Sequence, residues 1–150
     1  MFRKIELLAA AALLLLGSAP GALAQEPIAT ADGETTGTRI EITELSRSSG
    51  ETVTLKFRIA NDSGEDASPY NLMERDDAGN VHLIDAAGKK KYLVMTDSDG
   101  KCVCSGGLEH GLVSGKSINL WARFPAPPAE VKEVSVVFPH FIPTDAPISD

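Results

Sequence analysis

The two cysteines of this 150-residue chain lie two positions apart, in the segment KCVCSGG at residues 101–107. In an extended strand, Cys102 and Cys104 would point to the same face with Cα atoms about 6.6 Å apart, at the upper limit for a disulfide. The glycines that follow would permit the local bend that such a bond needs. We therefore expect an internal disulfide, and an intermolecular bridge, free thiols and a metal site are the alternatives.

A metal site would recruit further soft ligands to the cysteine pair. His110, with Met95 or Met73, would complete a set suited to Cu(I), or to Zn with one more ligand. Structural zinc clusters usually show two separated ligand pairs, which this sequence lacks. A thiol oxidoreductase is less favoured, because Lys101 is the only cation near the pair in sequence and no helix is predicted there. We expect no cofactor, and a Cu(I) or Zn carrier built on the cysteine pair and His110 is the alternative.

Other catalytic and ligand-binding patterns fail on spacing. His82, His110 and His140 are scattered, and no G-x-S-x-G nucleophile elbow accompanies them. The stretch GLVSGKS lacks the first glycine of a phosphate-binding loop, and DSDG at residues 97–100 lacks two carboxylates of a calcium loop. Both stretches are predicted to be hairpin turns. We expect that the protein is not an enzyme, and an extracellular enzyme is the third hypothesis.

Trp121 and Arg123 are the candidates for an interaction surface. In SINLWARF, residues 117–124, Ile118 and the alternate positions after it would face inward, which leaves Asn119, Trp121 and Arg123 outward. An exposed aromatic side chain and an arginine are favoured at interfaces. The alternative is that a loop or the N-terminal leader covers Trp121.

The elements that must position these residues read as strands. Apolar residues occupy alternate positions in ETVTLKFRIA (51–60) and in RIEITEL (39–45). Short apolar runs follow at 70–73, 81–84, 92–95, 102–104, 118–124 and 131–138, several of them separated by glycine-containing turns. No segment after residue 24 shows helical periodicity over three turns. We predict an all-β fold, an antiparallel immunoglobulin-like β-sandwich of about seven strands, with a small β-barrel as the alternative.

The N-terminus predicts export. A basic start is followed by an apolar run at residues 7–16 and by an A-x-A pattern that ends at Ala24. A membrane-spanning helix needs roughly 20 apolar residues, about twice the length of this run. We expect a signal peptide at residues 1–24, a secreted or periplasmic protein, and no membrane anchor after cleavage. Residues 25–37 are predicted to be a flexible leader and residues 38–150 a single domain.

The acidic net charge of the chain disfavours some classes of binding partner. The formal net charge is −7, and loss of Arg3, Lys4 and Glu6 with the signal peptide makes it −8. Nucleic acids and anionic lipids recruit lysine and arginine, so an acidic chain disfavours both. Export to an oxidising compartment also favours a disulfide over free thiols.

Four stretches resemble one kind of exported domain. They are VTLKFRIANDSGED, VHLIDAAGKKKYLVMTDSDGKCVCSGG, SGKSINLWARFPAPPAEVKEVSVVFPHF and the closing DAPIS. Across residues 38–149 the chain is similar to uncharacterised bacterial immunoglobulin-like domains, found alone, in lipoproteins or ahead of OmpA-like peptidoglycan-binding domains. The resemblance implies an envelope or extracellular role. We expect a non-enzymatic binding or structural module whose partner is an unknown envelope or extracellular protein or polymer.

Overall fold

The alternating segments of the sequence form the longest strands of the structure. β2 (Thr38–Ser48) and β3 (Thr52–Asn61) make an antiparallel hairpin, and β6 (Lys116–Pro125) pairs with the whole length of β3. The apolar side chains of β3 are all buried, as their period of two requires. These three strands therefore form a continuous, regular sheet with one face in the core.

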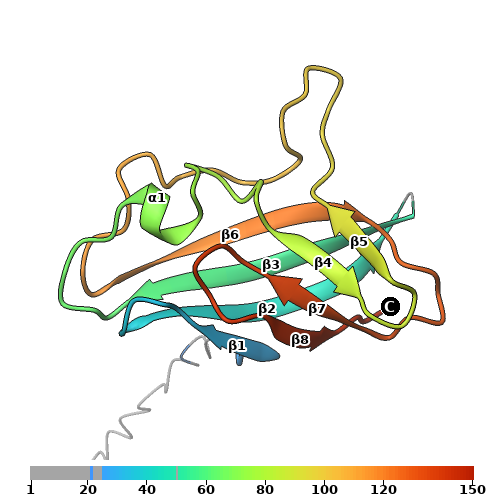
Figure 1. The fold of residues 1–150 in the computed structure, drawn as a ribbon, viewed down its shortest axis with the longest axis horizontal. Coiled ribbons are helices and arrows are strands. Elements are labelled where there is room, and N and C mark those ends of the chain that lie inside the picture. The colour runs from blue at the N-terminus through green and yellow to red at the C-terminus, as the bar shows by residue number, and fades with distance from the viewer. Residues whose placement is uncertain (1–20, 22–24, 50) are drawn as a thin grey trace, which may run out of the picture.

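The computed structural model describes residues 21, 25–49 and 51–150, so the predicted signal peptide lies outside the described residues apart from Gly21. Two antiparallel four-stranded sheets pack face to face (Figure 1), with strand orders β1-β2-β3-β6 in the first and β5-β4-β7-β8 in the second. The remaining strands are β1 (Ala29–Asp32), β4 (His82–Asp85), β5 (Lys90–Leu93), β7 (Glu133–Val137) and β8 (Thr144–Pro147).

The prediction of an antiparallel β-sandwich is confirmed, with eight strands instead of about seven. In constant-type immunoglobulin domains the second and third strands lie in different sheets. Here β2 and β3 are hairpin neighbours in the first sheet, and the chain then crosses to the second sheet for β4 and β5. The architecture is thus immunoglobulin-like in its layers, with a different order of strands.

A β-bulge interrupts the β2–β3 hairpin. Ile42 pairs with Phe57 and Glu44 pairs with Lys56, so that Thr43 is an extra residue without a partner on β3. The bulge explains why the inward apolar positions of β2 change their spacing, from Ile40 and Ile42 to Leu45. Thr43 keeps the outward position that alternation with Ile42 gives it, and the bulge brings Glu44 to the same face, opposite Lys56.

Part of the predicted flexible leader is ordered in the structure. Ala29–Asp32, within residues 25–37, forms β1 and pairs with the edge of β2, where Ala31 lies opposite Ile40. Ala31 is 4% exposed and joins the core. The domain therefore begins before residue 38. Its first strand is stabilised by pairing with β2, since its own four residues carry little apolar surface.

The apolar run at residues 70–73 was expected to form a strand, and it forms a helical turn instead. Helix α1 (Pro69–Leu72) begins after Ser68, whose hydroxyl accepts the N–H of Asn71 at 3.2 Å. Proline at the first helical position and serine at the N-cap are the preferred start of a helix. The turn directs Leu72 and Met73 into the core, where they are 1% and 0% exposed.

The core joins the two sheets through aromatic rings. Phe57 on β3 and Phe138, directly after β7, meet edge to face with ring centroids 4.9 Å apart. Phe141 extends this contact from Phe138 at 6.5 Å. In the part of the chain that the structure describes, no helix has the length and apolar character needed to cross a bilayer.

Other parts of the chain cover the edges of the sandwich at β1, β8 and β6. On one side β1 lies beside β8, Gly33 bridges Phe141, and Ser149 bridges β2 at Ser46. On the other side the segment 95–105 pairs with the outer edge of β6. Covered edges protect a sheet from pairing with other chains. The second covering segment carries both cysteines.

Candidate functional site

The loop between β5 and β6 rises above the two sheets (Figure 1), and the bridge between Thr96 and Cys102 places the cysteines at its base. At its tip, Asp97 Oδ1 accepts the backbone N–H groups of Asp99 and Lys101, each at 2.9 Å. The N–H of Asp97 donates to the carbonyl oxygen of Lys101 at 2.8 Å. The DSDG stretch is therefore a hairpin turn, as the sequence predicts, with its first carboxylate bonded to its own backbone.

Cys102 and Cys104 form a disulfide in the structure, and their Cα atoms are 5.3 Å apart. This separation is shorter than the roughly 6.6 Å of a regular strand, so the chain bends between them. The N–H of Val103 donates to the carbonyl oxygen of Met95 at 2.7 Å, which holds the bend against the opposite arm of the loop. Both cysteines are partly buried against the core.

The disulfide segment is hydrogen-bonded to β6 at Trp121. Cys104 bridges Ala122, and the N–H of Ser105 donates to the carbonyl oxygen of Trp121 at 2.9 Å. The Ser105 hydroxyl accepts the backbone N–H of Trp121 at 2.8 Å. The cysteine pair therefore fixes the short segment that holds the backbone of Trp121 from the outer edge of the sheet.

The structure does not assemble the expected metal set of Cys102, Cys104 and His110. Among the described residues, the carboxylate whose oxygen lies within 4.8 Å of both sulfurs is Asp77, and His110 is outside this group. Arg75 binds Asp77 with two nitrogens, at 2.7 and 2.8 Å. This contact lowers the pKa of the Asp77 carboxyl, and the carboxylate is already neutralised. A metal would have to displace Arg75 and break the disulfide.

The disulfide is expected to contribute little to global stability, because it closes a loop of only three residues. The double variant Cys102→Ser, Cys104→Ser should lower the free energy of unfolding by less than about 2 kcal/mol. Urea unfolding followed by circular dichroism measures this change, and thiol titration before and after reduction measures the bond. Two titratable thiols in unreduced protein, together with one equivalent of tightly bound Cu(I) or Zn, would contradict the disulfide and favour a carrier.

A groove of about 430 Å³ crosses the outer face of the first sheet beside Trp121. We call it the Trp121 groove. Its lining residues are Gln25, Thr43, Lys56, Phe57, Arg58, Asn119, Leu120 and Trp121. Trp121 is 38% exposed, whereas the side chains of Phe57 and Leu120 belong to the core. The groove therefore presents one large apolar side chain among polar ones.

Regular pairing across three strands sets the spacing of the groove. Lys56 lies opposite Trp121, and Arg58 lies opposite Asn119. Alternate residues of a strand share a face about 6.6 Å apart, so Asn119 and Trp121 stand side by side on β6. At the far wall the side-chain amide of Gln25 donates to the carbonyl oxygen of Thr43, the bulge residue, at 3.1 Å. Arg123 shares this face but does not line the groove.

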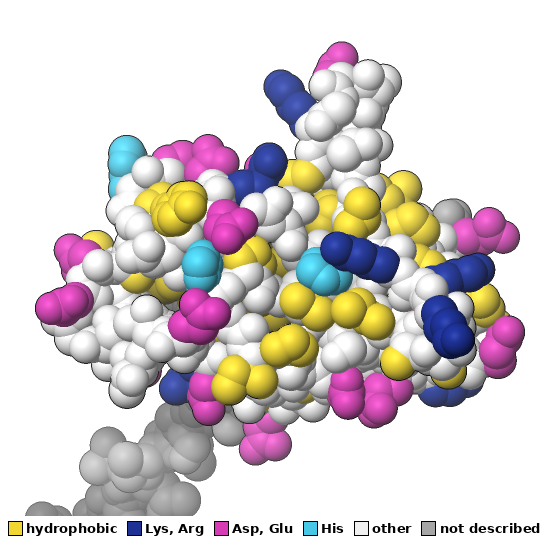
Figure 2. Space-filling model, viewed as in Figure 1, with side chains coloured by type: hydrophobic (Ala, Val, Ile, Leu, Met, Phe, Trp, Pro, Cys, Tyr) yellow, Lys and Arg dark blue, Asp and Glu magenta, His cyan; other side chains and the backbone are white. Residues whose placement is uncertain are grey.

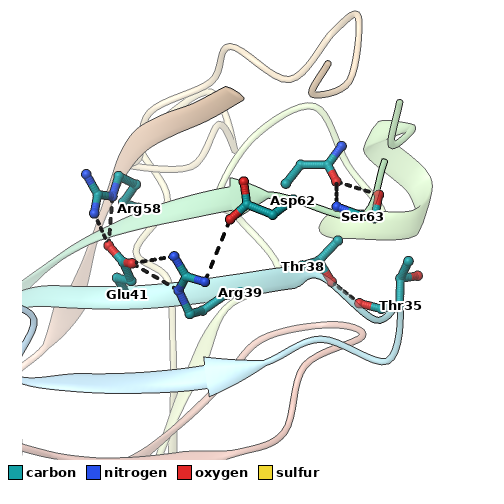
Figure 3. Close-up of polar contacts among 8 residues, drawn as sticks. Thr35, Thr38, Arg39, Glu41, Arg58, Asp62 and Ser63 are labelled. Carbon is teal, nitrogen blue, oxygen red and sulfur yellow. Dashed lines mark hydrogen bonds and ion pairs between the residues drawn. The ribbon is translucent and has the colours of Figure 1, made fainter. Parts of the chain in front are cut away.

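A carboxylate neutralises Arg58 at the floor of the groove. Glu41 on β2 lies between Arg58 and Arg39 (Figure 3). Its carboxylate accepts a hydrogen bond from Nε of Arg58 at 2.8 Å and another from Nε of Arg39 at 3.0 Å. Burial alone would raise the pKa of Glu41, but the hydrogen bonds from Arg58 and Arg39 outweigh it, and the pKa lies below its ordinary value. Glu41 is therefore ionised at neutral pH and is shared by Arg58 and Arg39, and Arg39 also lies 3.8 Å from a carboxylate oxygen of Asp62.

Lys56 is neutralised in the same way. Its Nζ lies 2.8 Å from Oε2 of Glu44, and Ser46 donates to the other carboxylate oxygen at 2.6 Å. The hydrogen bond from Lys56, followed by the one from Ser46, lowers the pKa of the Glu44 carboxyl. Both cations of the Trp121 groove thus carry a bound carboxylate, and the groove is close to neutral.

The three histidines belong to different surroundings, and histidine side chains lie apart on the surface in Figure 2. His82 is on β4 opposite Leu93, and burial, followed by the charge of Lys91, lowers its pKa. His110 is exposed between β5 and β6. Nδ1 of His140 lies 3.1 Å from Glu34. Among the described residues, this is the only hydrogen bond between a histidine and another side chain. No described serine or cysteine is hydrogen-bonded to a histidine.

The sequence prediction placed Trp121 on the outer face but did not find the groove around it. Lys56, Arg58 and Asn119 occupy outward positions of predicted strands, so alternation alone could have suggested them. Thr43 also has an outward position, next to the inward Ile42, whereas Gln25 was assigned to the leader. No protein-family model and no curated protein sequence matches this chain. Function is therefore inferred from the fold and from the Trp121 groove.

Proposed function

We propose that this protein is an exported, non-enzymatic binding or structural module of the bacterial cell envelope. We further propose that it contacts its partner through the Trp121 groove. The observation that carries the proposal is the exposed indole of Trp121 on a rigid sheet face, in a groove of about 430 Å³. Ligand sites in proteins are concave, span roughly 300–1,000 Å³, and combine aromatic side chains with a few placed polar groups.

The position of Trp121 supports a preorganised contact. Its backbone is paired with Lys56 of β3 on one side and with Ser105 on the other. The disulfide at Cys102 and Cys104 restrains the segment that supplies Ser105. A backbone held in this way loses little conformational freedom on binding, which favours affinity. In this reading the cysteines serve the binding surface as a structural support.

Export rests on the sequence of residues 1–24, and a secreted or periplasmic location follows from it. The acidic net charge supports an envelope or extracellular partner over nucleic acid. An unknown protein or polymer of the envelope remains the partner class. An enzyme is the less favoured proposal, because His140 is paired with the carboxylates of Glu34 and Glu74 and the cysteines are joined to each other.

A Cu(I) or Zn carrier is the second candidate, and one observation favours it. Asp77 lies within 4.8 Å of both sulfurs and would replace His110 as the third ligand after reduction. Carboxylate is a harder ligand than imidazole and suits Zn better than Cu(I). The bidentate contact of Asp77 with Arg75 opposes this use of the carboxylate.

The proposed function is tested by retention on the envelope. Purified protein is mixed with isolated envelopes of the host, and the fraction that sediments with them is measured. Trp121→Ala should lower the apparent affinity at least about fivefold, because a central aromatic contact contributes more than 1 kcal/mol to binding. Tyr70→Ala is the matched control, since Tyr70 is 70% exposed and does not line the groove. Equal retention of Trp121→Ala and the unaltered protein would contradict the proposal.

A further inference from the structure

We propose that the Trp121 groove binds a neutral glycan chain, with the indole of Trp121 as the surface on which a sugar ring stacks. This inference rests on the proposed function, because it names the class of ligand that the same groove takes. Three observations support it. They are the isolated aromatic ring of Trp121, the polar groups of the described residues beside the ring that have free hydrogen-bonding capacity, and the carboxylates that pair with the cations of the groove.

The aromatic ring has the setting that a sugar needs. Trp121 is the one lining residue with an exposed large apolar side chain, since Phe57 and Leu120 face the core. The face of an aromatic ring is electron-rich, and it attracts the weakly positive C–H groups of a pyranose ring. A single platform matches a ligand built of rings of that size and leaves the ring edges to polar groups.

Neutral hydrogen-bonding groups surround the platform. Within the described residues, the side-chain amide of Asn119 and the indole N–H of Trp121 make no hydrogen bond with protein, and Oε1 of Gln25 accepts none. Together they offer amide and indole N–H donors and amide oxygen acceptors. A sugar hydroxyl both donates and accepts, so it pairs with either kind of group. These groups would fix the orientation of a ring stacked on Trp121.

The charges of the groove disfavour an anionic polymer. Lys56 is held by Glu44, and Arg58 by Glu41, so a carboxylate or phosphate group on the ligand would compete with a bound protein carboxylate. The net charge of the protein after loss of the signal peptide, −8, adds long-range repulsion. A neutral chain meets neither cost.

A protein partner fits this surface less well. A stable interface buries about 800 Å² on each partner around an apolar centre. On the Trp121 groove one exposed aromatic side chain is surrounded by Lys56, Asn119 and other polar groups. The other large exposed apolar side chains, Ile28, Tyr70, Leu93, Val113 and Ile142, do not line this groove.

Intrinsic fluorescence tests the inference directly, because Trp121 is the single tryptophan of the chain. The protein, as the cell exports it, is titrated with two neutral probes, the β-1,4-linked tetramers of N-acetylglucosamine and of glucose. At least one should shift the emission of Trp121 to shorter wavelength, as water leaves the indole. Calorimetry should give a Kd that changes little between low and high salt, because screening affects charged contacts.

Matched variants assign the signal to the groove. By calorimetry, Trp121→Ala should weaken binding at least about tenfold, the loss typical of a central aromatic contact. Asn119→Ala should weaken it by a smaller factor, and Tyr70→Ala should leave it unchanged. Circular dichroism checks that each variant is folded.

Three results would overturn the inference. The first is the absence of heat and of an emission shift with both neutral tetramers at millimolar concentration. The second is tighter, salt-sensitive binding of an anionic probe, a tetramer of galacturonate. The third is saturation of the groove by a purified envelope protein when both tetramers fail. If Trp121→Ala still lowers retention on envelopes in these cases, the proposed function stands and only the glycan is wrong; unchanged retention contradicts both.

Discussion

Phe57→Ala is expected to lower the free energy of unfolding by about 3–5 kcal/mol, the cost of removing a fully buried aromatic side chain from a packed core. Phe57 is 1% exposed, and its ring meets that of Phe138 at 4.9 Å and an interplanar angle of 61°. The contact joins β3 of the first sheet to the end of β7 in the second. Its loss therefore leaves a cavity between the sheets. Urea unfolding followed by circular dichroism measures the change.

Phe57→Leu keeps this prediction testable if the alanine variant does not fold. Domains of this size have total stabilities of about 5–15 kcal/mol, so the alanine variant could lose most of its folded population. Leucine retains most of the apolar volume and should cost less than about 2 kcal/mol. Ile28→Ala is the surface control, since Ile28 is 43% exposed. A loss below about 1 kcal/mol for Phe57→Ala would show that this contact does not hold the sheets together.

Gly111→Ala is expected to destabilise the protein by about 2–3 kcal/mol more than Gly115→Ala. Both glycines have positive φ, 75° and 78°, so alanine at either position adopts a left-handed conformation that costs about 1–2 kcal/mol. The two positions differ in the room that they leave for a Cβ atom. A Cβ atom at Gly111 would lie 2.1 Å from the carbonyl oxygen of Ala67, whereas nothing lies within 4 Å of one at Gly115.

The backbone at Ala67 has little freedom to relieve this clash. Ala67 and Leu112 exchange two backbone hydrogen bonds, at 3.0 and 2.8 Å, which link the segment before α1 to the segment before β6. Asn61, fully buried, also donates its side-chain amide to the carbonyl oxygen of Leu112 at 2.9 Å. Thermal unfolding of the two alanine variants in parallel gives the comparison. Equal melting temperatures would show that the Ala67 segment moves aside without cost.

The sequence determined the strands that carry their own pattern. In β3 and β6 every second residue is apolar, and this period alone fixes which side chains face the core. The outward positions of Trp121 and Arg123 followed from it and are confirmed. The end of β3 could also be predicted from the sequence. The side chain of Asn61 accepts a hydrogen bond from the N–H of Ser63, and this local bond favours a turn.

Elements that are stabilised by contacts with distant parts of the chain could not be predicted from their own sequence. β1 and β8 have four residues each, ATAD and TDAP, and their strand conformation comes from pairing with β2 and β7. The apolar run at residues 70–73 is too short to show a period of two or of 3.6. The N-cap at Ser68 favoured a helical turn there. Short segments take the structure that their neighbours offer, so the sequence of the segment alone underdetermines it.

The candidate site divides in the same way. The sequence by itself determined the all-β class, the nearness of Cys102 to Cys104, and the outward direction of Trp121, because each depends on residues adjacent in the chain. Only the tertiary structure decided that Ser105 supports Trp121, that Glu41 and Glu44 neutralise the cations beside it, and that Asp77 replaces His110 near the sulfurs. Those contacts join separate strands and loops, and their register is set by packing of the whole sandwich.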